Sequence, residues 1–381
     1  MKKIIIITLF ILGIILPNIN VKAVSIGGIN VDTINSGDGL YIDSYESGRY
    51  IYRGQNPNNY IKFNGELWRI IAKEADGTYK IIRNDLLDKM PFDNGSHRHT
   101  QNNTYCTEPS RGCGVYAAVD GIFKSQSNLQ SGTVTEDSSI KEYLNDDYYV
   151  NNINEIAKKQ ILSHSFNIGA VEYLDDASQD SIERNQQGEG MYTWTGNVGL
   201  ANVTDILKAS INPLCTSATT SGNVYDSCNN NYLLDRGSND TLYYWTINAS
   251  YNISIYSSSF VWGASAINNW GVYIGPAGVA YSNAYNSPRP VVFLKSDVKF
   301  CGSGTESDPY IVSDKCSNEN QEEQTDSTNI DGNTENNNNQ GPEVVEVPST
   351  SAYGSIIIAV LGIICVIVSV FVMRRVTKKE N

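Results

Sequence analysis

Two apolar segments bracket the rest of the chain and constrain where it can fold. Lys2 and Lys3 precede an apolar run from Ile4 to Leu16, and Ala23 follows soon after. A basic start, a short apolar middle and a small residue at the cut are the parts of a secretory signal. The run has thirteen residues. As a helix it would rise about 20 Å, less than the roughly 30 Å core of a bilayer. We therefore predict a signal peptide over 1–23.

The second apolar segment, Ser355 to Met373, has nineteen residues and no charge. As a helix it would rise about 28 Å, enough to cross a bilayer. Basic residues follow it at 374, 375, 378 and 379, and such residues stay in the cytoplasm. We expect a transmembrane helix over 355–373 and a cytoplasmic basic tail over 374–381. The protein would then be a single-pass membrane protein at the cell surface, with an extracellular N-terminal domain.

The segment ahead of this span is acidic and poor in apolar residues. From Ser317 to Val347 there are eight acids and no Lys or Arg. Such a composition cannot bury enough apolar surface to offset the entropy lost on ordering. We predict a disordered acidic stalk over 317–354. The whole chain has a net charge of −13, which argues against a nucleic-acid partner, because phosphates require a basic face.

The exported part contains six cysteines in three couples that are close in sequence. An oxidising exterior permits disulfides, and short loops close at the least entropic cost. Six cysteines allow fifteen pairings, and the local pairing is favoured. Zinc is disfavoured because no Cys-x-x-Cys spacing occurs. The expected disulfides join Cys106 to Cys113, Cys215 to Cys228, and Cys301 to Cys316.

The clearest local fold signal is Asn64-Gly65, which stands between two β-rich runs. Both residues accept positive φ, so the pair predicts a tight hairpin. The strand over 66–73 meets a second turn at Asp76-Gly77, and a strand over 79–83 follows. Alternation places Leu67 and Arg69 on one face and Trp68 on the other. We expect an antiparallel meander that is covered on both faces.

Helices are expected to be few and short. Ser139 and Glu142 have capping-box spacing, and a second helix is expected within 153–161. We also expect a helix over 180–187 and one that Thr204 caps, while later strands are predicted over 242–247, 258–264, 271–274 and 289–294. The fold class is therefore α+β: an antiparallel sheet with short helices and long disulfide-stapled loops. We place this domain at 45–316, after an N-terminal extension over 24–44.

Catalytic and metal signals are weak. Asp93, His97 and His99 are the best metal-like cluster, but the loop-like sequence around them favours a solvated loop, so we assign no metal and no cofactor. Gly-x-Ser-x-Gly, the usual hydrolase elbow, is absent. His164 is the only isolated candidate base once the cysteines are paired. We assign no catalytic residue and expect a protein that is not an enzyme.

A binding surface is better supported by an aromatic-rich stretch over 257–286. Trp270, Tyr273 and Tyr281 stand there among Gly, Ser and Asn, and aromatic rings among small polar residues can stack on a sugar or a peptide. We take these three residues as the candidate ligand-binding set. Packing in the core explains Trp245 and Trp262 equally well.

The pentapeptide Val347-Pro348-Ser349-Thr350-Ser351 precedes the apolar span and basic tail. This order resembles the cell-wall sorting signal of Gram-positive surface proteins, whose usual pentapeptide is Leu-Pro-x-Thr-Gly. Pro348 and Thr350 match that pattern, whereas Val347 and Ser351 depart from it. The resemblance implies a sortase partner and wall attachment. The departure leaves a plain membrane anchor as the alternative.

Several stretches together resemble an uncharacterised domain of surface proteins from Gram-positive gut bacteria. They cover roughly 45–315, and no activity comes with the family. The late part, a tryptophan strand, a variable loop and an Arg-Pro strand, also looks like a C-type-lectin-like fold. The calcium triplets of such lectins are absent, so this likeness implies no calcium. The stretches are 52–60, 63–71, 194–200, 245–247, 289–295 and 304–310.

The sequence thus predicts a non-enzymatic, anchored bacterial cell-surface protein that binds a glycan or protein ligand. The main alternative is a structural envelope protein without a specific ligand, and a cell-envelope enzyme is the third.

Overall fold

The computed structural model describes much of the chain between Lys22 and Cys316. The described residues are 22–93, 114–124, 131–134, 136–172, 180–216, 228, 230–234, 243–251, 260–267, 271–278, 286–313 and 316. They belong to one compact unit. Most of the side chains in β8, β9, β15 and β16 lie outside the description, and these strands are used here through their backbones only.

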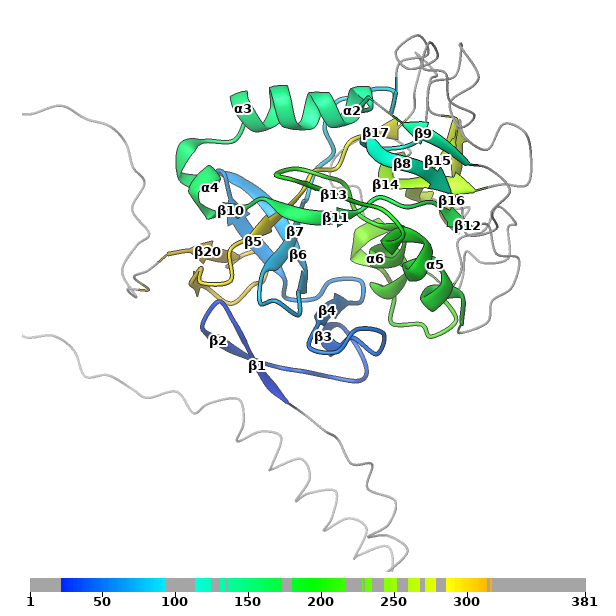
Figure 1. Ribbon diagram of the computed structural model, residues 1–381. Coiled ribbons are helices and arrows are strands. Elements are labelled where there is room, and N and C mark those ends of the chain that lie inside the picture. Colours follow the sequence, from blue (N-terminus) through cyan, green and yellow to red (C-terminus); the bar gives the residue numbers. More distant parts are fainter. Residues whose placement is uncertain are drawn as a thin grey trace, which may run out of the picture. The chain divides into compact units, whose positions relative to one another are not determined.

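The main sheet of the described residues has nine strands (Figure 1). Its order is β10-β18-β7-β6-β5-β20-β19, and β4 joins β6 to β3. The members are β3 (Gly39–Ile42), β4 (Tyr50–Arg53), β5 (Tyr60–Phe63), β6 (Glu66–Lys73), β7 (Tyr79–Arg83), β10 (Ile161–Leu162), β18 (Val291–Leu294), β19 (Phe300–Cys301) and β20 (Tyr310–Val312).

A five-stranded sheet and three two-stranded sheets complete the β structure of the described residues. The five-stranded sheet contains β12 (Val171–Glu172), β14 (Tyr243–Tyr251), β15 (Phe260–Ile267), β16 (Gly271–Gly278) and β17 (Asn286–Ser287). The pairs are β1 (Ala23–Ile26) with β2 (Ile29–Asp32), β8 (Val119–Lys124) with β9 (Ser131–Val134), and β11 (His164–Asn167) with β13 (Thr193–Gly196).

Short helices accompany these sheets, so the predicted α+β class is confirmed in outline. The sheets are mixed, however, because β5 and β20 pair in parallel, as do β12 and β14. The helices are α2 (Ser139–Glu142), a π-helical turn (Tyr143–Tyr148), α3 (Tyr149–Asn151), α4 (Glu155–Gln160), α5 (Asp180–Gly190), α6 (Val203–Lys208) and a 3₁₀ turn (Tyr232–Leu234).

The predicted meander forms β5, β6 and β7, in the expected antiparallel order. Asn64 and Gly65 have φ of 56° and 76° at the first turn, the conformation that selects this residue pair. Trp68 is fully buried on one face, and Arg69 is 2% exposed on the other. Both faces are therefore covered. Burial of an arginine is possible here because its Nε donates to Asn59 Oδ1 at 2.6 Å and its guanidinium lies 3.5 Å from the centre of the Tyr60 ring.

The segment ahead of residue 45 takes part in the fold. β3 pairs with β4 from Gly39↔Arg53 to Ile42↔Tyr50, and β1 and β2 form a hairpin nearby in sequence. The sequence treats 24–44 as an extension because its Gly- and Ser-rich composition carries little hydrophobic pattern. Only the pairing with β4 reveals the strand.

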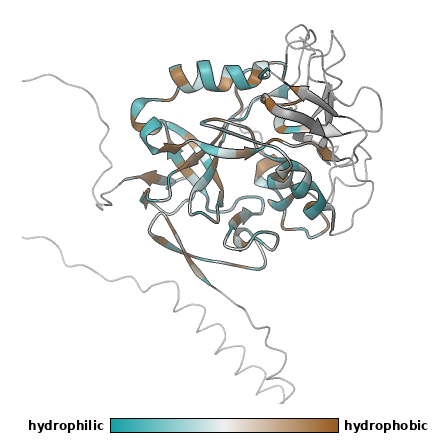
Figure 2. Cartoon of the chain, in the orientation of Figure 1, coloured by the Kyte–Doolittle hydropathy of each residue, from teal (hydrophilic) through white to brown (hydrophobic). Residues whose placement is uncertain are grey.

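The helical segment that begins at Ser139 packs one face inward, with Ile140, Leu144 and Tyr148 buried. Hydrophobic and hydrophilic residues are mixed along it (Figure 2). Its N-cap is Ser138, one residue before the expected Ser139. The Ser138 Oγ accepts from Lys141 N at 3.3 Å and donates to Tyr116 O at 2.6 Å. Ser139 instead donates to Asp93, which explains the shift by one residue.

Two of the three expected disulfides are present, Cys215–Cys228 and Cys301–Cys316, with sequence separations of 13 and 15. Cys106 and Cys113 lie outside the described residues. We predict that the double variant Cys215→Ser/Cys228→Ser loses about 2–4 kcal/mol of unfolding free energy, because a cross-link of this length restricts the unfolded chain. Chemical denaturation without reductant measures the loss.

As a control for this prediction, Cys301→Ser/Cys316→Ser removes a disulfide that closes a loop of similar length elsewhere in the chain. A wild-type midpoint for the Cys215→Ser/Cys228→Ser variant would contradict a stabilising role for the first disulfide.

Candidate functional site

The ligand-binding set expected from sequence lies largely outside the described residues. Trp270 and Tyr281 are not described. Tyr273 lies on β16, where it pairs with Ser265 of β15, but its side chain is not described. Trp245 is 1% exposed and donates its Nε1 to Met90 O at 2.9 Å, so it belongs to the core. The binding role of the three aromatic residues therefore stays a prediction.

The predicted anchor also lies outside the described residues, as do the stalk, the sorting-like motif Val347–Ser351 and the signal segment up to Val21. Within the ranges that are described, no helix is long and apolar enough to cross a membrane.

The candidate metal cluster is not assembled in the described part of the chain. Asp93 is fully buried, and its Oδ1 accepts from the backbone N and the Oγ of Ser139. Its carboxylate thus accepts hydrogen bonds from the first residue of α2. An acid is favourable there because the first N–H groups of a helix have no partner within the helix. His97 and His99 lie outside the description. No group of three His, Cys, Asp or Glu residues that could hold a metal ion occurs among the residues that are placed.

The structure instead reveals a polar pocket of about 240 Å³ between the main sheet and helices α5 and α6. Figure 1 shows these two helices side by side, with β11 running beside the sheet. Three aromatic rings, several amides and a set of charged groups line the pocket. The lining residues are Glu46, Arg49, Glu74, Lys80, His164, Ser165, Phe166, Asn167, Gln186, Glu189, Asn202, Thr204, Asp205, Lys208 and Phe293. We call it the polar pocket.

Asp205 lies at the centre of the charged groups. It occupies the first turn of α6, and its Oδ2 accepts from the Asn202 backbone N–H at 3.0 Å. This places the carboxylate at the positive end of the helix. Lys80 Nζ reaches the same oxygen at 2.5 Å, and Arg49 Nη2 reaches Oδ1 at 3.1 Å. The Asp205 carboxylate therefore connects α6 to β7 and to the residue that precedes β4.

The expectation that Thr204 caps this helix was wrong, because Asn202 is the N-cap residue. Thr204 lies two residues beyond Asn202, and both its backbone N–H and its hydroxyl donate to Glu189. Asn202 and Thr204 are close in sequence, and both residue types are good N-caps. Asn202 is held at the N-cap position because its side-chain amide donates to the Asn167 backbone oxygen and to Asn248 Oδ1.

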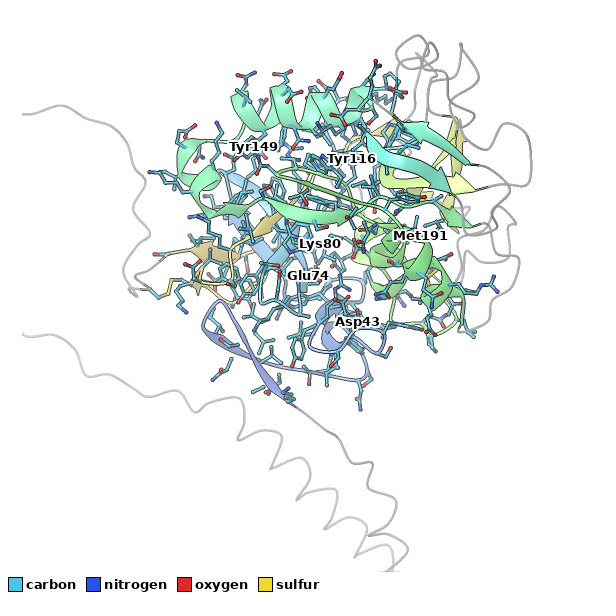
Figure 3. The ribbon with its side chains drawn as sticks, viewed as in Figure 1. Asp43, Glu74, Lys80, Tyr116, Tyr149 and Met191 are labelled. Carbon is cyan, nitrogen blue, oxygen red and sulfur yellow. A yellow bond between two sulfur atoms is a disulfide. The ribbon has the colours of Figure 1, made fainter. Side chains whose placement is uncertain are left out.

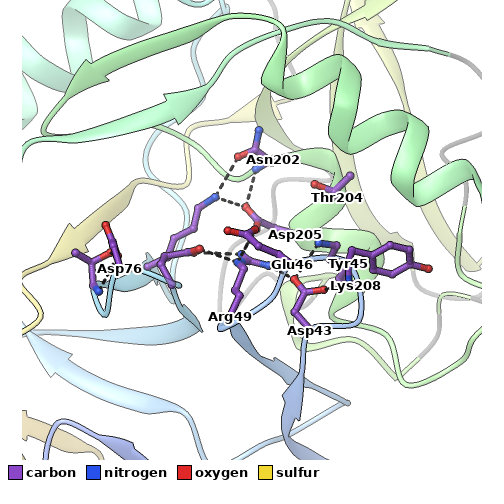
Figure 4. A network of polar contacts seen from close by, with 12 residues as sticks. Asp43, Tyr45, Glu46, Arg49, Asp76, Asn202, Thr204, Asp205 and Lys208 are labelled. Atoms are coloured by element: carbon purple, nitrogen blue, oxygen red, sulfur yellow. Dashed lines mark hydrogen bonds and ion pairs between the residues drawn. The ribbon is translucent and has the colours of Figure 1, made fainter.

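Arg49 extends the network toward the β3–β4 loop (Figure 4). It precedes β4, and its guanidinium contacts Asp43 at 2.9 Å, Glu74 at 2.7 Å and Asp205 at 3.1 Å. Lys208 Nζ lies 2.9 Å from Asp43 Oδ2, the same oxygen that Arg49 contacts. Three acids and three cations are thus interleaved, and Figure 3 shows Asp43, Glu74 and Lys80 of this set. We call Asp43, Arg49, Glu74, Lys80, Asp205 and Lys208 the ion network.

Pairing, rather than solvent, keeps Asp43, Asp205 and Arg49 charged. Burial alone would raise the pKa of Asp43, but Lys208 and Arg49 outweigh it and hold the pKa below its ordinary value. The pKa of Asp205 is lowered against burial in the same way by Lys80 and Arg49. For Arg49, burial opposes the charge, yet Glu74 and Asp205 raise its pKa. Each ion is therefore stable only while its partners remain in place.

Glu189 differs from these acids. It lies near the end of α5, it is 1% exposed, and its contacts are the two donations from Thr204. Burial raises the pKa of Glu189 to about 7, although the Thr204 hydrogen bonds oppose the shift. The pocket thus holds one carboxyl group that changes its charge near neutral pH.

His164 and Phe293 form an aromatic wall of the pocket. Their rings stack with centres 3.9 Å apart and an angle of 17°, and Phe166 meets Phe293 at 5.0 Å. The His164 Nε2 lies 2.9 Å from Asp76 Oδ2, and its Nδ1 lies 3.0 Å from Ser165 O. Asp76 belongs to the turn between β6 and β7, so this contact joins β11 to the main sheet.

Sequence reasoning missed most of the pocket, although it singled out His164. The ion network joins residues from 43 to 208, and single charges scattered over that length carry no pattern. One signal was available: Asn202 and Asp205 have the spacing of a helix N-cap and its third residue. It identifies a helix start but gives no sign of a site.

We predict that Lys80→Met lowers the unfolding free energy by about 3–5 kcal/mol, the range for breaking a buried pair, because Asp205 loses a cation and Asn202 Oδ1 a donor. Lys62→Met is the matched control, since Lys62 is an exposed lysine of the same sheet. Denaturant unfolding of both variants measures the difference. Equal losses of unfolding free energy in Lys80→Met and Lys62→Met would show that the Lys80 ammonium group adds no stability beyond that of its alkyl chain.

We also predict a pH-dependent effect of Glu189→Gln. The folded pKa of Glu189, about 7, lies above its ordinary value of 4.5. The wild type therefore loses stability as pH rises through this window, because the folded state must give up a tightly held proton. The glutamine variant lacks that loss. It should match the wild type below about pH 4 and gain on it by up to about 3 kcal/mol near pH 8.

Denaturant unfolding at several pH values tests this second prediction. Glu183→Gln is the control, because Glu183 is exposed on the same helix. A constant difference between Glu189→Gln and the wild type across pH would rule out titration of Glu189 in this range.

Comparison with known protein families, curated proteins and solved structures finds no match to this chain. The resemblance to surface-protein domains and to a sorting signal therefore stays a prediction. The function must be argued from the pocket and from the sequence.

Proposed function

We propose that the protein is a non-enzymatic, anchored bacterial cell-surface protein that binds a glycan or protein ligand. The observation that carries the binding part is the polar pocket, where the ion network and an aromatic wall surround about 240 Å³ of space. Polar side chains with fixed orientation next to aromatic rings are what a ligand site requires.

Location outside the cell is supported by the two disulfides, which persist in oxidising surroundings. The signal-like start, the acidic stalk and the apolar span with its basic tail support an anchored protein. Attachment to the wall through a sortase acting on Val347–Ser351 belongs to the same proposal.

Binding without catalysis is supported by the state of the pocket acids. Asp205 forms ion pairs with Lys80 and Arg49, which hold its pKa below the ordinary value. A carboxylate held in this way is a weak base, because its proton affinity is lowered by its partners. A cell-envelope enzyme would instead have to use Glu189, whose pKa suits proton transfer.

A C-type-lectin-like arrangement is the finer part of the fold proposal. What supports it is the order of the late elements: the tryptophan strand β14, a long intervening segment, and β18 directly after Arg289-Pro290. Arg289 is buried and donates to Arg83 O, Leu233 O and Asn84 O. Sugar binding does not follow from this fold alone.

An array of glycans and surface proteins, probed with the full-length protein in detergent, tests the proposed function. We expect saturable binding to members of one ligand class, weakened by Trp270→Ala. Ile156→Ala is the control, because Ile156 is exposed and lies away from the polar pocket. An array without a hit would favour a structural envelope protein.

A further inference from the structure

We propose that the polar pocket is a subsite for one uncharged sugar residue, such as the terminal residue of a glycan. This inference rests on the proposed function and narrows it to a place and a ligand class. It is independent of Trp270, Tyr273 and Tyr281.

The charges of the pocket argue for an uncharged ligand. Each charged side chain of the lining already has a hydrogen-bonding or ion-pair partner: Arg49, Lys80 and Lys208 with carboxylates, and Glu189 with Thr204. A charged ligand would have to separate one of these buried pairs, which is costly in a low-dielectric site. Hydroxyl groups can add hydrogen bonds without displacing a pair.

Donors for such hydroxyls remain in the network. Lys80 Nζ donates to Asn202 and Asp205, and Lys208 Nζ donates to Asp43 and Gln186. An ammonium group has three N–H donors, so each lysine has one left. The Gln186 Oε1 accepts from Lys208, and its amide N–H groups remain as donors. Carboxylate oxygens around them supply acceptors.

The aromatic wall provides the complementary surface. A sugar ring has an apolar face of C–H groups as well as its hydroxyl edge. His164 is half-buried and offers the apolar surface beside the polar groups, with the buried rings of Phe293 and Phe166 packed behind it. The two kinds of surface come from different elements, since the rings belong to β11 and β18 and the lysines to β7 and α6.

The size of the pocket limits the ligand to a single ring. Its volume of about 240 Å³ lies below the roughly 300–1,000 Å³ of pockets that take drug-sized ligands. Longer glycans would have to continue outside. Because one small ligand has few atoms, we expect affinity on the order of millimolar for a free monosaccharide.

The test is a titration of the full-length protein in detergent with a panel of neutral monosaccharides, uronic acids, amino sugars and free amino acids, read by saturation-transfer NMR. We expect saturable binding of at least one neutral sugar and at least tenfold weaker binding of the charged compounds. Preferential binding of a charged class, or of none of these compounds, would overturn the inference.

A variant that fills the pocket locates the site. Ser165 is an exposed residue of β11 that lines the pocket and is not part of the ion network, so Ser165→Trp should weaken sugar binding at least tenfold. Ser25→Trp is the matched control, since Ser25 is an exposed serine in the two-stranded β1–β2 sheet. Unchanged sugar binding in Ser165→Trp would overturn the inference.

A second readout applies if Ser165→Trp fails to fold. The imidazole resonances of wild-type His164, assigned with His164→Ala, should shift on titration with the bound sugar, and their constancy would overturn the inference. Array binding that persists in Ser165→Trp, with no shift at His164, would sink the subsite but leave the proposed function intact. Absence of binding in both the array and the panel would sink both.

Discussion

The carboxylate of Asp205 is the contact on which the arrangement around the pocket depends. It accepts from its own helix start at Asn202, from Lys80 of β7 and from Arg49 ahead of β4. Removing water from two charges costs several kcal/mol per ion, and their attraction repays this only with good geometry and further hydrogen bonds. The ion network meets that condition because five of its members contact two or more polar groups, and Glu74 contacts Arg49 through both carboxylate oxygens.

Such a network contributes little to stability compared with an apolar core of the same volume. Its consequence is specificity of position. The β3–β4 loop, the end of β6, β7 and α6 have to come together in one arrangement, because any other would leave buried charges unpaired. Apolar residues of the same elements, among them Trp68, Ile81 and Ile206, are buried, but apolar contacts are non-directional. We infer that the pocket keeps its shape through the charges rather than through the core.

The local features of the fold follow from sequence because their causes are local. Asn64-Gly65 defines the first turn of the meander through its positive φ values, and two cysteine couples close as short loops. The predicted start of α2 is one residue from its observed N-cap, Ser138, and the predicted cap of α6 is two residues from Asn202. Such differences arise because several neighbouring residues can cap a helix. The parallel pair of β5 with β20 escapes sequence reasoning, since nothing in either strand names a partner 250 residues away.

The sequence by itself determined an α+β class, an acidic segment and an apolar span, because composition and short-range pattern carry that information; export stays a prediction from the same patterns. It also singled out His164 as the only isolated candidate base. Only the tertiary structure decided that His164 stacks on Phe293 and bonds to Asp76, and that residues between 43 and 208 share one ion network. The reason is physical: each of these charges is stable when buried only beside its partners, and those partners meet only when the chain is folded.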